Sequence, residues 1–145
     1  MASVALLVGP STPTTCRVSS VLNKDRTLYG AQNMFDGVDD TCWNSGQGHG
    51  QQVCLLFHRA VHVKRVELMF QGGFVGEDAK VLIATQATPE LHVATECHFN
   101  DSNELQTLEL NCTDVTQLRL QFDRSSDFYG RVLLYHCRVL GHETL

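Results

Sequence analysis

The sequence has no long apolar run and no cluster of basic residues. No segment approaches the roughly 20 consecutive apolar residues that cross a bilayer as a helix. The 11 Lys and Arg residues are outnumbered by 16 Asp and Glu, and the closest basic pair is Lys64 and Arg65. Proteins that bind nucleic acid directly present a basic stripe to the phosphates, so this balance argues against direct nucleic-acid binding. It also argues, more weakly, against binding to anionic membranes.

Signatures of catalysis are missing as well. The sequence contains no Gly-x-Ser-x-Gly elbow, no P-loop and no Gly-x-Gly-x-x-Gly fingerprint. The glycine-rich segment 46–50 is not followed by a helical pattern that would offer N–H groups to a phosphate, so it indicates a surface loop. Cys54, His58 and His62 have a spacing that suits zinc only on a helix, but Cys54 stands in a predicted strand. We therefore expect a protein that is not an enzyme.

Linkers and repeats are absent, and only three prolines occur among the 145 residues. We expect one domain over residues 1–145, with its core at about 16–141. The apolar start, residues 1–10, lacks the basic region of a secretory signal and predicts an ordinary N-terminal extension of a protein that is not secreted. The six cysteines are then expected to be reduced thiols, although their even number would also permit a disulfide scaffold.

What the sequence does contain is hydrophobic alternation with a period of two. Three segments show it, 52–57, 65–70 and 117–122, and the last is the cleanest pattern of a half-buried strand. Further strands are expected at 81–84, 91–99, 105–110 and 131–140, the last of them central and buried on both faces. Turn-forming segments separate the strands at 46–50, 71–74, 100–103 and 123–127. The pattern predicts an all-β fold, an antiparallel sandwich or barrel.

One segment, residues 29–45, differs from the alternating strands. It begins with a short apolar stretch at 31–35, which predicts one short helical turn, and continues with Asp36 and Gly37. An Asp-Gly pair favours a tight turn with positive φ at the glycine. The only tryptophan, Trp43, follows this turn, and its size suits a core position between two sheets.

Oxygen-bearing side chains gather in the same segment. Clustered Asp and Thr oxygens with nearby backbone carbonyls suit a hard cation such as Ca²⁺. The candidate ligands of a structural calcium are Asp36, Asp39 and Thr41, with carbonyl oxygens around Asn33. The competing interpretation is a capped turn whose carboxylates accept hydrogen bonds from backbone N–H groups, and we favour it.

The Asp-Gly-x-x-x-Thr-x-Trp pattern of residues 36–43 resembles the opening motif of discoidin, or coagulation-factor type C, domains. Segments 51–57 and 131–141 resemble the strand that follows the motif and the strand that closes the domain. The resemblance implies a galactose-binding-domain-like fold, which is a jelly roll of about eight antiparallel strands. Three positions depart from the family pattern: Gln52 replaces a tryptophan, Leu56 an aspartate, and His136 stands near a glutamate of the calcium-binding members.

Four further blocks, 17–23, 41–45, 70–74 and 127–131, resemble a family of small animal proteins that associate with a nuclear receptor. This resemblance implies a nuclear receptor of the testicular orphan type as the partner. It also implies a location in the nucleus and cytoplasm, and a corepressor role in which association keeps the receptor off its DNA element.

Ligands of discoidin-like domains contact loops at one end of the sandwich. The corresponding segments here are 44–50, 71–77 and 124–131. Their candidate binding residues are Gln47, His49, Phe74, Phe128, Tyr129 and Arg131. Aromatic and Arg side chains supply much of the binding energy at interfaces, so a non-enzymatic protein-binding module is our first hypothesis.

The individual roles of these loop residues can also be predicted. Phe74, which lies between glycines, is expected to be the exposed apolar tip, whereas at least one of Phe128 and Tyr129 is expected in the core. Arg131 is expected to pair with Asp127. The alternative function is a carbohydrate-binding module of the galactose type, in which Phe74 stacks on the sugar beside His49.

Overall fold

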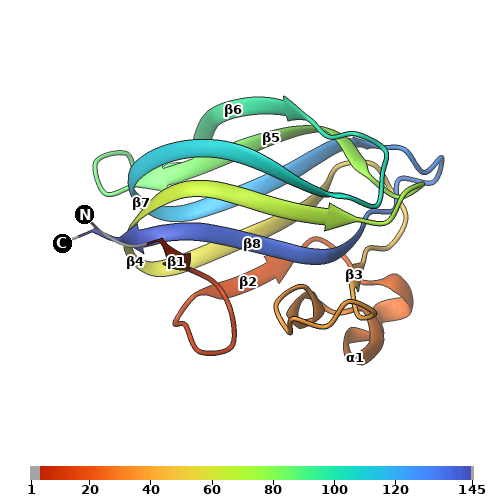
Figure 1. Ribbon diagram of the computed structural model, residues 1–145. Helices are drawn as coiled ribbons and strands as arrows, with labels where there is room; N and C mark the ends of the chain where they lie inside the picture. Colours follow the sequence, from red (N-terminus) through yellow and green to blue (C-terminus); the bar gives the residue numbers. More distant parts are fainter. Residues whose placement is uncertain (1–3, 145) are drawn as a thin grey trace.

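The structure is a computed structural model that describes residues 4–144. Within this range eight strands and three short helical turns follow one another. They are β1 (Ala5–Leu6), β2 (Thr15–Val18), η1 (Leu22–Lys24), α1 (Arg26–Tyr29), η2 (Ala31–Met34), β3 (Trp43–Asn44), β4 (Gln51–Phe70), β5 (Gly76–Thr85), β6 (His92–His98), β7 (Leu105–Ser125) and β8 (Leu133–Glu143). Figure 1 shows the strands as a sandwich, with the helical turns below it beside β2 and β3. No helix in the described range is long and apolar enough to span a membrane.

All strand pairs are antiparallel, and two strands belong to both layers of the sandwich. In one layer, residues 51–56 of β4 pair with β2 on one side and with residues 117–122 of β7 on the other. β7 in turn pairs with β5, and β5 pairs with β6. In the other layer, residues 61–70 of β4 lie between β8 and the first half of β7. β8 also pairs with β1 and β3. The all-β, jelly-roll prediction is therefore confirmed.

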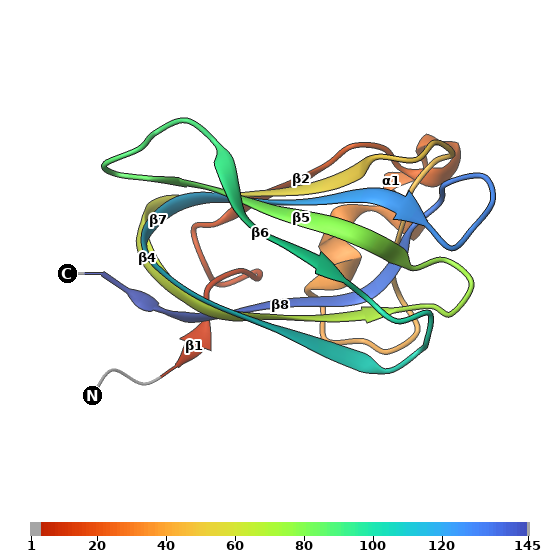
Figure 2. The ribbon, with the colours of Figure 1, turned by 90° about the horizontal axis from the view of Figure 1, so that it is seen from above.

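β4 and β7 fold over from one layer into the other, in the curved region on the left of Figure 2. The register of their pairing shifts between Leu56 and Val61, next to His58, whose φ is 60°. On β7, Asn111 and Asp114 also have positive φ, at 53° and 57°. Residues in this conformation bend a strand and interrupt its ladder, as β-bulges do. The alternation had predicted both halves of each strand, but as separate strands.

The core lies between the two layers and is made by the alternating residues. Val53, Leu55 and Phe57 are fully buried, as the period of two predicts. Trp43 is also fully buried, and its Nε1–H donates a hydrogen bond of 2.8 Å to the Ser20 carbonyl oxygen. The prediction that the tryptophan occupies a core position between the sheets is confirmed. Burial of an apolar side chain of this size contributes about 1.5–3 kcal/mol.

The two ends of the chain differ from the sequence-based expectation. β1 pairs with β8, and Leu7 and Val8 are buried, so the expected core limits of 16–141 were too narrow at the N-terminal side. β8 is central, as expected, but it continues past Gly141 and carries the exposed Arg138, so it is not buried on both faces throughout. The first residues of the expected extension, 1–3, lie outside the described residues.

The helical segment is longer than predicted. η2 confirms the turn expected at 31–35, but η1 and α1 were not expected. α1 begins at a cap, since the Asp25 carboxylate accepts a hydrogen bond of 3.1 Å from the Leu28 N–H. Four residues are too few for an apolar period to be recognised in the sequence.

All six cysteines are free thiols in the structure. Cys137 is buried and the others are half-buried. Burial, with a smaller contribution from Cys54, raises the pKa of the Cys16 thiol to about 12, and burial raises the pKa of Cys97 to about 11. These thiols are therefore protonated near neutral pH and behave as small apolar side chains.

Candidate functional site

Three loops meet at one end of the sandwich, on the right in Figure 1. They are residues 46–50, 71–75 and 126–132, and the first two continue the opposite ends of β4. The Gly48 N–H donates a hydrogen bond of 2.7 Å to the Tyr129 carbonyl oxygen, and the Leu133 N–H donates one of 3.1 Å to the Phe74 carbonyl oxygen. The structure thus brings together all the predicted binding residues, which are Gln47, His49, Phe74, Phe128, Tyr129 and Arg131.

His49 joins two of these loops through its ring. Its Nδ1 accepts a hydrogen bond of 3.1 Å from the Ser125 N–H, and its Nε2 lies 3.2 Å from the Phe128 carbonyl oxygen. Because only an N–H can donate to that carbonyl, these partners select the neutral tautomer with the proton on Nε2. Both ring nitrogens are occupied, so His49 braces the loop that carries Phe128.

Gly130 allows the same two loops to approach closely. Its φ is +84°, and a Cβ at this position would overlap the backbone of Gly48 and His49. Only glycine combines this conformation with this approach. Gly130 is visible in the sequence, but its need to be glycine is not. The backbone that it approaches lies about 80 positions earlier in the chain, and only the fold brings the two together.

Gln51 fixes the 46–50 loop from inside the protein, a role that the sequence analysis missed. Its buried side chain accepts a hydrogen bond of 2.6 Å from the Ser20 hydroxyl through Oε1. Its Nε2 donates to the carbonyl oxygens of Gly48, at 2.8 Å, and Gln47, at 3.4 Å. The alternating pattern could have predicted that Gln51 faces inward, because Gln51 is in phase with the inward-facing Val53.

The exposed aromatic residues of the site are not the expected ones. Phe74 is half-buried, with the Arg131 guanidinium 5.1 Å from its ring centroid, so the prediction of an exposed tip was wrong. Phe128 and Tyr129 are 86% and 56% exposed, so the prediction that one of them packs in the core was also wrong. Their rings contact each other edge to face, with centroids 5.3 Å apart. The reason is that His49 and Gly48 hold the backbone of this loop, which leaves both side chains outside.

Arg131 is held by Asp127, as predicted. The Asp127 Oδ2 accepts hydrogen bonds from the Arg131 Nε, at 3.1 Å, and from its backbone N–H, at 3.0 Å. Burial alone would raise the pKa of the Asp127 carboxyl, but the hydrogen bonds and the charge of Arg131 outweigh it and lower the pKa below 3.8. Arg131 therefore lies fixed between Asp127 and the ring of Phe74, as a part of the loop scaffold.

The candidate calcium ligands form a capped turn. The Asp36 carboxylate accepts hydrogen bonds from the Val38 N–H, at 2.9 Å, and from the Thr41 hydroxyl. The Asn33 side chain, which is buried, donates to the carbonyl oxygens of Leu28 and Cys42. Burial would raise the pKa of Asp36, but the hydrogen bonds from the Thr41 hydroxyl and the Val38 N–H outweigh it and lower the pKa. Both carboxylate oxygens of Asp36 thus accept hydrogen bonds from within the turn.

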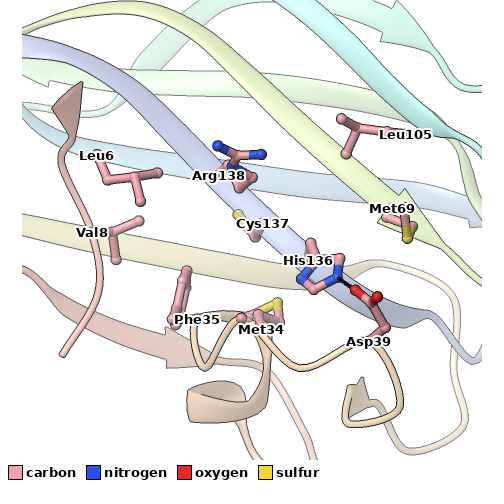
Figure 3. Close-up of a pocket in the computed structure, with 11 residues that line it drawn as sticks. Leu6, Val8, Met34, Phe35, Asp39, Met69, Leu105, His136, Cys137 and Arg138 are labelled. Carbon is pink, nitrogen blue, oxygen red and sulfur yellow. Dashed lines mark hydrogen bonds and ion pairs between the residues drawn. The ribbon is translucent and has the colours of Figure 1, made fainter. Parts of the chain in front are cut away.

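Asp39 points in another direction, toward β8. Its Oδ1 lies 2.9 Å from the His136 Nε2, at the edge of a hollow of about 440 Å³ that Met34 and Phe35 also line (Figure 3). His136 therefore lies against the turn, where calcium-binding discoidin domains are expected to place a glutamate. Within residues 4–144 no three His, Cys, Asp or Glu side chains gather as a metal site. Calcium binding by Asp36, Asp39 and Thr41 stays a prediction.

The fold is that of discoidin-like β-sandwich domains. An F5/8 type C domain from Bacteroides fragilis matches with a TM-score of 0.76 and 14% identity, over 91% of this chain and 93% of that chain. Chitosan-binding module 1 from Paenibacillus sp. IK-5 matches with a TM-score of 0.73 and 17% identity, over 93% and 98%. A family 32 carbohydrate-binding module from C. perfringens, solved with galactose, matches with a TM-score of 0.72 and 12% identity, over 88% and 93%. At these identities the likeness concerns the fold alone.

The sequence defines the family more narrowly. No family model matches the chain. The chain is 40% identical to the nuclear receptor 2C2-associated protein of Homo sapiens over 130 residues, which are 90% of this chain and 93% of that protein. It is 42% identical to the protein of the same name from Xenopus laevis over 128 residues, which are 88% and 93% of the two chains. The chain belongs to the family of nuclear receptor 2C2-associated proteins.

Proposed function

We propose that this chain is a non-enzymatic protein-binding module that associates with a nuclear receptor of the testicular orphan type and hinders the binding of that receptor to DNA. Its relatives, at about 40% identity, carry a nuclear receptor in their names. The observation that carries the proposal is the exposed aromatic pair, Phe128 and Tyr129, on a loop that the neighbouring loops hold in place. The proposed location is the nucleus and cytoplasm.

The geometry of the aromatic pair suits a protein contact. An aromatic side chain that projects from a rigid loop buries a large area at low entropic cost, and such residues dominate interface energies. The His49 ring and the Gly48 N–H fix the backbone at Phe128 and Tyr129 before any partner binds. The loop therefore pre-organises the two rings for contact.

Net charge supports the proposal that the module hinders DNA binding by the receptor. The chain has a formal net charge of −5 at pH 7. A receptor surface that binds DNA is basic, so an acidic module is attracted to it and is repelled by the duplex. Binding of the module and of DNA to that surface would then be mutually exclusive.

A binding assay with the purified receptor tests the association. We expect the Phe128→Ala variant to bind at least about tenfold more weakly, as is usual for an interface hot spot. Val93→Ala is the matched control, because Val93 is 51% exposed on β6 and is outside the three loops. Absence of a complex at low salt, or equal losses in both variants, would refute the proposed contact.

A mobility-shift assay with the receptor and its DNA element tests the mechanism. The module should release the receptor from DNA in proportion to its concentration, and Phe128→Ala should do so less. A stable complex that contains module, receptor and DNA together would contradict the competitive mechanism while leaving association intact.

The alternative function is carbohydrate binding, which the galactose-bound structural neighbour supports. A sugar needs an exposed aromatic face, and Tyr129 offers one, whereas the predicted Phe74 lies under Arg131. Titration with galactose, followed by NMR shifts of the 126–132 loop, tests it. A spectrum that does not change at high galactose concentration removes this alternative.

A further inference from the structure

A second surface lies away from the three loops, along the outer edge of β2. β2 pairs with β4 and with no other strand in the described part of the chain. Beside it is a groove of about 920 Å³ between β2 and the helical turns. We call it the basic groove because its lining contains Arg17, Lys24 and Arg26 and no acidic side chain. Figure 2 shows β2 as the outermost strand of its layer.

Within residues 4–144, the three cations of the basic groove have no ionic partner. Six of the 11 Lys and Arg side chains form ion pairs, and three of the five others line this one groove. Arg17, Lys24 and Arg26 are all exposed. Asp25, the acidic residue between two of them, caps α1 instead. In a chain with a net charge of −5, this is a local concentration of unneutralised positive charge.

The backbone of β2 has free hydrogen-bonding groups at the same place. The Ser19 N–H donates to the Gln52 carbonyl oxygen at 3.0 Å, and the register continues through Arg17 opposite Cys54. Because hydrogen-bonded positions alternate along an antiparallel strand, the N–H and C=O groups of Cys16 and Val18 point away from β4, toward the open edge. An extended peptide can pair with such an edge and continue the sheet.

The side chains on the two faces of β2 define what such a peptide should contain. Cys16 and Val18 face inward and pack against the core, and Val21 and Ala31 continue this apolar floor. Arg17, which alternates with them, faces outward. Cross-strand neighbours lie on the same face, so a residue opposite Arg17 would place its side chain beside the guanidinium. Acidic residues that alternate with small apolar ones match both faces.

We propose that β2 binds an extended acidic peptide segment of a partner protein, which adds as a strand at the open edge and places its carboxylates against Arg17, Lys24 and Arg26. The main-chain hydrogen bonds align the segment, and the cations select it by charge. This surface is separate from the one that Phe128 and Tyr129 form, so the chain can hold two segments or two partners at the same time.

Fluorescence anisotropy with a labelled peptide of about ten residues, in which Glu alternates with Val or Ala, tests the proposal. The same peptide with Lys in place of Glu should not bind. The triple variant Arg17→Glu, Lys24→Glu, Arg26→Glu should weaken binding of the acidic peptide by at least about tenfold, given three exposed charge pairs. Lys64→Glu is the matched control, because Lys64 is exposed, forms no ion pair with any of the described residues and lies outside the groove.

A second pair of changes tests the strand addition itself. Val18→Pro removes only an N–H that points away from β4, and proline is tolerated at such edge positions. It should weaken binding by at least about threefold, through the lost hydrogen bond. A peptide that is N-methylated at alternate residues should lose affinity for the unchanged protein, which keeps the test valid if Val18→Pro does not fold. Phe128→Ala should leave peptide binding unchanged.

Several results would overturn the proposal. If Lys64→Glu weakens peptide binding as much as the triple variant does, the peptide responds to the overall charge of the protein and not to the basic groove. Binding that survives both Val18→Pro and peptide N-methylation does not use the strand edge. If neither peptide binds and the triple variant self-associates in sedimentation experiments, the three cations only protect the edge from pairing with a second copy.

Discussion

Replacement of Gly130 by alanine tests how the candidate site is held together. The glycine has a φ of +84°, and a Cβ would overlap the backbone of Gly48 and His49. The left-handed conformation alone costs an alanine about 1–2 kcal/mol. Separation of the loops would also break two hydrogen bonds, from Gly48 and His49 to the 126–132 loop, at about 0.5–1.5 kcal/mol each. The expected loss of unfolding free energy is therefore about 2–5 kcal/mol.

Gly73→Ala is the matched control for this substitution. Gly73 has a φ of +89°, but a Cβ there would meet no atom within 4 Å. It therefore carries the conformational cost of about 1–2 kcal/mol without the loop separation. The difference between the two variants measures the contact of the loops.

Urea unfolding, followed by the fluorescence of the single, buried Trp43, gives both free energies. Hydrogen exchange of the Gly48 amide, whose N–H donates to Tyr129, adds a local measurement. We expect this amide to lose its protection in Gly130→Ala and to keep it in Gly73→Ala. Equal destabilisation of the two variants, with the Gly48 amide still protected, would refute the role assigned to Gly130.

Other regions of the molecule lead to three further predictions. Trp43→Ala should lower the free energy of unfolding by about 3–5 kcal/mol in urea titrations, since it leaves a large cavity in the core. Asp127→Asn should be less stable than the parent at pH 7, and the gap should close as the pH falls below 3.8 and protonates the parent carboxylate, as acid-dependent melting would show. Millimolar calcium should leave the melting temperature unchanged, because Asp36 already accepts two hydrogen bonds; a rise that Asp36→Asn abolishes would instead establish the calcium site.

The fold was predictable wherever a strand has one buried and one exposed face. The alternation of residues 52–57 and 117–122 gave both the strand and its inward face. It did not show that β4 is one strand that folds over at His58, because the bend depends on pairing with β7 and β8. The short α1 left no periodic signal at all.

The candidate site was predictable in its location but not in its roles. The loops could be chosen because the resemblance to discoidin-like domains implies ligand contacts at one end of the sandwich, and the residues because aromatic and Arg side chains are typical of interfaces. Whether Phe74 or Phe128 is exposed depends on which side chain Arg131 covers and on which backbone His49 holds. Those contacts join residues about 60 and 80 positions apart in the sequence, and residue type alone does not predict them.

The continuity of β4 and β7 through both layers also has a consequence for folding. Pairing of Gln51 with Phe122 joins positions about 70 residues apart, and the other half of each strand must find its own partner in the second layer. Such non-local contacts slow the search for the native topology, typically to milliseconds or seconds. A chain cut at the bend near His58 would yield two fragments, neither of which contains every strand of either layer. The domain should therefore fold in a single cooperative step, and the candidate loops at both ends of β4 should form only when that step is complete.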